Sequence, residues 1–132
     1  MIILFLATAL SLLAIMLWAR YDLSRFLRTT SVISDEATLD EFKALARHNM
    51  YGAVAYLTLG AVFLAVGFCL VVRTGVVGTC LVLLFSIPGY YLSKSTRELE
   101  ICSRMLRCTH PEIESEYARV RHSWLKRLLP DF

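Results

Sequence analysis

Three long apolar stretches without a single charged residue make up almost half of the chain. They cover residues 1–19, 51–72 and 76–92, and none of them contains Asp, Glu, Lys, Arg or His. A helix of about 20 mostly apolar residues crosses the ~30 Å hydrocarbon core of a bilayer. The first two stretches reach this length, and the third approaches it when it extends to Ser93. We therefore expect an all-α integral membrane protein with three transmembrane helices.

The segments between the spans predict one tight turn and one longer helical connection. Residues 73–75 are so short a connection that the second and third spans must be antiparallel neighbours. Residues 20–28 continue the first helix, and residues 29–34 lack periodicity and predict a loop. Thr38 and Glu41 have the spacing of a capping box, which predicts a helix start there. No breaker follows, so this helix should run directly into the second span.

The tail over residues 93–132 predicts two more helical pieces. Residues 95–107 open with Ser-x-x-Glu, a second capping-box pattern, and extend the third span. This helix should end before Pro111, because the residue that precedes a proline avoids the helical conformation. Residues 112–129 form an amphipathic C-terminal helix with apolar positions at helical spacing. Neither the tail nor residues 20–50 are long enough for a separate globular core, so we treat all 132 residues as one membrane domain.

Basic residues are distributed very unevenly along the chain. Thirteen of the 14 Lys and Arg residues lie in segments 20–50 and 93–132, whereas Arg73 alone lies in the turn between spans two and three. Basic loops remain in the cytoplasm. The predicted orientation is therefore N-terminus outside and C-terminus in the cytoplasm, and we expect the inner (plasma) membrane of a bacterium as the location.

Small residues repeat along the second span and occur again at the start of the third. In lipid, helices associate through close packing, which small side chains permit. We predict that these positions form helix contacts, within one chain rather than between copies. The positions are Ala53, Gly60, Gly67, Gly75 and Gly78.

The amphipathic C-terminal helix is a candidate docking element. Its basic groups can lie on an anionic membrane surface, each contributing about 1 kcal/mol. Its apolar stripe can instead dock on a partner protein or on the helix around residues 39–47, and the sequence leaves these uses open. Acidic residues interleave the basic ones, so we expect no nucleic-acid partner. The candidate docking residues are Ile113, Tyr117, Arg119, Val120, Arg121, Trp124, Lys126, Arg127 and Leu128.

Residues that would indicate a reaction are missing from the sequence. The spans contain no ionisable side chain, which argues against a stand-alone secondary transporter. No catalytic motif is present, so we expect neither an enzyme nor a bound cofactor. Cys102, Cys108 and His110 do not have the spacing of a structural zinc site. We expect free cysteines, and a bridge between Cys69 and Cys80 stays open because spacing cannot establish disulfide geometry.

These features favour a non-catalytic small membrane subunit or adaptor of a larger complex. Its partners would be the lipid bilayer and a larger membrane protein, or further copies of itself. The alternative is a self-assembling pore, because three spans with an outer N-terminus and a basic tail are similar in topology, though in no motif, to small phage holins. A third interpretation is a lipid- or quinone-handling protein, which would require a groove.

Overall fold

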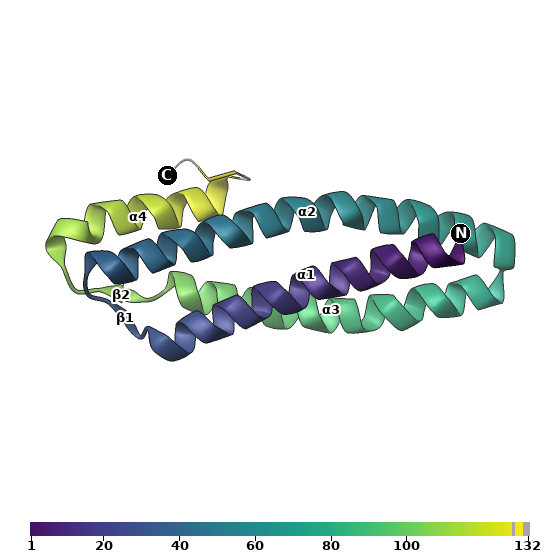
Figure 1. Cartoon of the computed structure of the whole chain (residues 1–132), viewed down its shortest axis with the longest axis horizontal. Coiled ribbons are helices and arrows are strands. Elements are labelled where there is room, and N and C mark those ends of the chain that lie inside the picture. Colours follow the sequence, from purple (N-terminus) through teal and green to yellow (C-terminus); the bar gives the residue numbers. More distant parts are fainter. Residues whose placement is uncertain (128, 131–132) are drawn as a thin grey trace.

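The computed structural model describes residues 1–127 and 129–130, which form four helices and two very short strands (Figure 1). Three of the helices in this part of the chain are long and apolar enough to cross a membrane, which confirms the all-helical class and the three candidate spans. In chain order the elements are α1 (Ile2–Thr29), β1 (Val32–Ile33), α2 (Glu36–Thr74), α3 (Val76–Arg104), β2 (Arg107–Cys108) and α4 (Pro111–Lys126).

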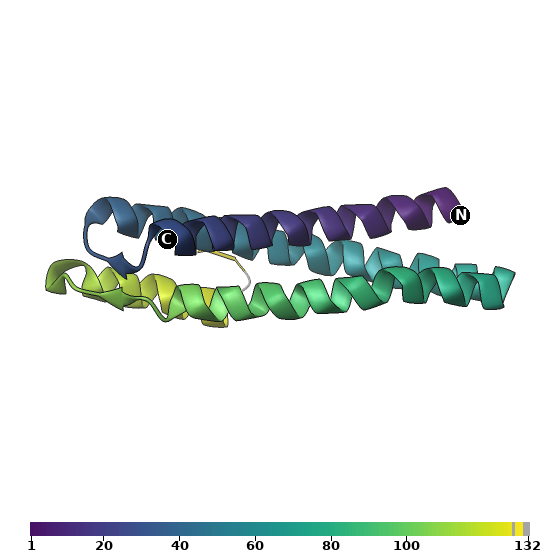
Figure 2. The same ribbon diagram turned by 90° about the horizontal axis from the view of Figure 1, so that it is seen from below.

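The three long helices run side by side and give the molecule an elongated shape (Figures 1 and 2). The N-terminus and the connection between α2 and α3 lie at one end, which we call the hairpin end. The C-terminal end of α1, both strands and α4 lie toward the opposite end, which we call the basic end because segments 20–50 and 93–127 carry the basic residues there.

The long helices continue beyond the apolar stretches. α1 includes residues 20–28, and α2 runs unbroken from the basic end through the second apolar stretch. The predicted helix start at Thr38 was wrong, because Asp35 is the N-cap residue. The Thr38 backbone N–H donates to Asp35 Oδ1 at 2.8 Å, and the Asp35 backbone N–H donates to the Thr38 hydroxyl at 3.2 Å. The hydrogen bond from the Thr38 backbone N–H is the main cause that lowers the pKa of the Asp35 carboxyl, and the hydrogen bond from the Thr38 hydroxyl lowers it further.

α3 is one continuous helix, so the predicted capping box at residues 95–98 marks no helix start. The helix ends at Arg104 rather than residue 107, because Arg107–Cys108 pairs in parallel with Val32–Ile33 of the predicted loop. The Thr109 N–H also donates to the Ile33 carbonyl at 3.1 Å. This pairing connects the segment after α1 with the segment after α3.

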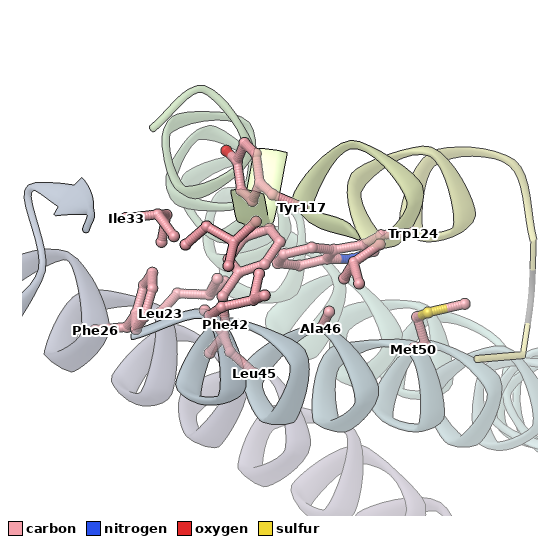
Figure 3. Packing of buried hydrophobic residues seen from close by; sticks show 12 residues of the cluster. Leu23, Phe26, Ile33, Phe42, Leu45, Ala46, Met50, Tyr117 and Trp124 are labelled. Atoms are coloured by element: carbon pink, nitrogen blue, oxygen red, sulfur yellow. The ribbon is translucent and has the colours of Figure 1, made fainter. Parts of the chain in front are cut away.

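Most of the buried apolar residues lie at the basic end, where α1, β1, α2 and α4 share one core (Figure 3). Phe42 on α2 lies at its centre and is 0% exposed. Its ring centroid lies 6.1 Å from that of Phe26, 5.1 Å from that of Tyr117 and 5.5 Å from that of Trp124. Two segments too short to form cores of their own, residues 20–50 between the first two spans and the tail after the third, therefore build one core together.

Candidate functional site

The apolar stripe of α4 packs inside the chain, on the same part of α2 that the sequence offered as one of its possible docking surfaces. Tyr117 also donates its hydroxyl hydrogen bond to main-chain carbonyls, at 3.2 Å to Arg104 and 2.8 Å to Leu106. Burial raises the pKa of Tyr117. Four of the candidate docking residues are therefore core residues and are not available to a partner: Ile113, Tyr117, Val120 and Trp124.

Polar contacts also hold α4 and the end of α3 in place. Lys43 Nζ on α2 lies 2.6 Å from Glu116 Oε1 on α4 and 3.3 Å from Asp40 Oδ1. The hydrogen bond to Glu116 is the main cause that raises the pKa of Lys43. Arg104 forms an ion pair with Glu100, and its guanidinium lies 5.2 Å from the ring centroid of Trp124.

The basic candidate docking residues remain at the surface. We call these four exposed residues the basic face of α4 and its C-terminal end, and they are Arg119, Arg121, Lys126 and Arg127. Arg119 Nη2 lies 3.8 Å from Glu116 Oε1, a weak contact on an exposed surface. Leu128, the remaining candidate, lies outside the described residues.

Two of the predicted packing glycines lie at close helix approaches near the hairpin end. A Cβ on Gly67 would lie 3.4 Å from Val82 Cγ2 and 3.6 Å from Phe5 Cε2, so α1, α2 and α3 meet there. A Cβ on Gly78 would lie only 2.8 Å from the Leu70 carbonyl oxygen, so α3 approaches the α2 backbone at this point. Gly75 connects the two helices with φ of 57°, a conformation that favours glycine.

The other two predicted packing positions make no such contact. A Cβ on Gly60 would have no neighbouring atom within 4 Å, and Ala53 is exposed. Gly89 on α3 is equally open. Here the small side chains leave space between the helices instead of bringing the helices together.

This space is a groove with two connected parts, which we call the inner and outer parts. The inner part has a volume of about 560 Å³ and lies between α1, α2 and α3, with Gly60 and Gly89 in its lining. The outer part, of about 300 Å³, lies nearer the basic end, where Trp124 of α4 also lines it. The parts share Met16, Tyr56 and Ser93 in their linings, so they adjoin one another.

The lining changes character along the groove. The inner part is lined mainly by apolar side chains, including Leu12, Phe63 and Phe85. The outer part adds polar and charged side chains from three elements. These are Asn49 on α2, Thr96, Arg97 and Glu100 on α3, and Arg127 after α4. The groove is therefore amphipathic, with its charged part toward the basic end.

Hydroxyl groups in the long helices bond within their own helices. The Thr8 hydroxyl donates to the Leu4 carbonyl at 3.0 Å, and the Thr58 hydroxyl donates to the Val54 carbonyl at 3.0 Å. All four cysteines lie in the described part of the chain and are free thiols. Within residues 1–127 and 129–130, no group of His, Cys, Asp or Glu side chains has the arrangement of a metal site. The groove is thus the feature of this structure that best fits a ligand.

Comparison with known protein families, curated proteins and solved structures gives no match. The sequence did not reveal the groove, although it contained an ambiguous signal. A small residue on a membrane helix permits either a close contact or a gap, and the outcome depends on the residues that the neighbouring helices bring to that level.

Proposed function

We propose that this chain is a non-catalytic small subunit or adaptor of a larger membrane assembly. The basic end would lie in the cytoplasm of a bacterium, with the N-terminus outside. The distribution of Lys and Arg supports this orientation, because 13 of 14 lie at the basic end and only Arg73 lies at the hairpin end.

The observation that carries the proposal is the large exposed apolar surface of α3. The whole of α3 is described, and Gly78 and Ser103 are its only buried residues. Large apolar side chains such as Leu84 and Ile87 are exposed along its apolar part. Association of helices in lipid depends on packing contacts, because lipid tails are as apolar as the side chains. α3 therefore retains a large exposed apolar surface for a neighbouring helix.

The rigid basic end supports the same proposal. The shared core and the Lys43–Glu116 pair hold α4 against α2, so the basic face has a fixed position relative to the spans. A partner that docks on α3 within the membrane would therefore meet the basic face in a defined place. An acidic surface on that partner would be complementary to it.

Site-specific photocrosslinking in native membranes tests this proposal. A photoreactive residue at Leu84 on α3, which is 64% exposed, should crosslink to one particular membrane protein. The control is the same residue at Phe68 on α2, which is 71% exposed, and it should give lipid adducts or a different pattern. Depletion of the crosslinked protein should lower the amount of this chain. Identical patterns at both positions would contradict the proposal.

The two other sequence-based interpretations differ in their support. A self-assembling pore would require a polar face along the spans, and the hydroxyls of Thr8 and Thr58 are already bonded within their helices. If expression of the protein alone collapsed the membrane potential, the pore interpretation would replace the adaptor proposal. The lipid-handling interpretation required a groove, and the amphipathic groove is a specific observation in its favour.

A further inference from the structure

We infer that the groove between the three long helices binds an anionic phospholipid. An acyl chain would occupy the inner part, and the phosphate headgroup would lie at the outer part beside Arg97 and Arg127. This inference is independent of the adaptor proposal, because the groove is formed by one chain and needs no protein partner.

The size of the groove fits a small ligand. Its two parts, of about 560 and 300 Å³, fall within the range of about 300–1,000 Å³ that ligand sites occupy. The two parts adjoin at Met16, Tyr56 and Ser93, and we infer that a single molecule occupies both. An elongated molecule with one apolar and one polar end matches the change in lining.

A partner helix fits the inner part less well than an acyl chain does. An α-helix is a stiff cylinder about 10–12 Å wide. The inner part is an irregular gap between three helices of one chain. An apolar gap of this kind also lacks the packing contacts that hold helices together in lipid. A flexible acyl chain from the surrounding bilayer can supply those contacts.

The charge of the outer part favours a phosphate group. Among the described residues, Arg97 and Arg127 line it together with one acid, Glu100, and that acid is paired with Arg104. The described part of the outer lining therefore contains two guanidinium groups and one carboxylate. Guanidinium groups bind phosphate through paired hydrogen bonds, and basic pockets between membrane helices bind anionic headgroups. The side chains of Asn49 and Thr96 at the same level donate to the Leu45 and Leu92 carbonyls of their own helices, so the contacts to the phosphate come from the arginine residues.

Binding of defined lipids to the purified, delipidated full chain tests the headgroup assignment. Native mass spectrometry would compare phosphatidylglycerol with phosphatidylcholine of identical acyl chains. We expect at least tenfold tighter binding of phosphatidylglycerol, and Arg97→Gln should remove most of this preference. Arg73→Gln at the hairpin end is the control and should leave it unchanged. Equal affinity of the two lipids for the unsubstituted protein would overturn the inference without reliance on any variant.

A second pair of variants tests the acyl-chain assignment. Gly60→Leu places a large side chain in the inner part and should weaken binding of both lipids at least fivefold. Ala55→Leu adds the same side chain at an exposed position outside the groove lining and should have no effect. Inorganic phosphate should not compete with the lipid. Competition by phosphate alone, or full binding by the Gly60→Leu variant, would show an anion site without an acyl-chain site and would refute the inference.

Discussion

Replacement of Phe42 by alanine should release α4 from α2. The Phe42 ring is 0% exposed, and its centroid lies within 6.1 Å of those of Phe26, Tyr117 and Trp124. Truncation of a buried Phe to Ala costs about 3–5 kcal/mol, and part of this reflects lost aromatic pairs worth about 0.5–1.5 kcal/mol each. Since Phe42 contacts three rings, we expect a loss of about 4 kcal/mol in the stability of the basic end.

Hydrogen exchange of the α4 amides in nanodiscs measures this loss directly. Because about 1.4 kcal/mol corresponds to a factor of ten in an equilibrium constant, protection in α4 should fall on the order of 1,000-fold. Amides in the apolar parts of α1, α2 and α3 should keep their protection, because they lie outside the core around Phe42.

The matched control is Phe68→Ala on the same helix. Phe68 is 71% exposed and does not belong to the core at the basic end, so its truncation should leave α4 protection unchanged. If the Phe42→Ala and Phe68→Ala variants showed equal protection in α4, the reasoning that this core holds α4 would be refuted.

Two further substitutions test the glycine contacts and the N-cap of α2. Gly78→Ala should destabilise the protein by about 1–3 kcal/mol and lower its melting temperature in detergent, because the new Cβ meets the α2 backbone. Gly60→Ala should be neutral or stabilising, because its Cβ meets no neighbouring atom. A lower melting temperature for Gly60→Ala than for Gly78→Ala would contradict the assigned contacts. The lowered pKa of Asp35 means that its carboxylate stabilises the fold above its unfolded pKa of 3.8 and that this contribution is lost as the pH falls through the lower folded value. Asp35→Asn should keep the N-cap at pH 7 and reduce the loss of stability in acid. Thermal unfolding of both proteins between pH 2 and 7 measures this difference. An identical pH dependence of the two proteins would contradict the assignment of Asp35 as the N-cap carboxylate.

The sequence predicted the three long helices well because their signal is local and long. An uncharged apolar run needs no knowledge of its neighbours to be recognised. The start of α2 was harder to predict, because Asp35 and Thr38 form a capping box as readily as Thr38 and Glu41. The pairing of Val32–Ile33 with Arg107–Cys108 joins two-residue strands from distant parts of the chain, and such short strands have no periodicity to detect.

The packing of the spans depended on contacts between helices that a single helix cannot reveal. Gly67 meets Phe5 of α1, whose ring also lies 5.0 Å from that of Phe63 and 5.9 Å from that of Phe85. These rings fill the space between the helices near the hairpin end. Nearer the basic end, no comparable side chain reaches Gly60, and the same residue type lines a gap instead of a contact.

The two ends of the bundle explain why the groove lies between them. At the hairpin end, the turn at Gly75 and the contact at Gly78 fix α3 against α2. At the basic end, the core around Phe42 fixes α4 against α2, and Trp124 of α4 lines the outer part of the groove. The groove therefore lies between two levels at which the helices are held by contacts of their own. An apolar gap at this level is accessible to a ligand from the bilayer, and Arg97 and Arg127 at its outer part favour the phosphate group that we infer.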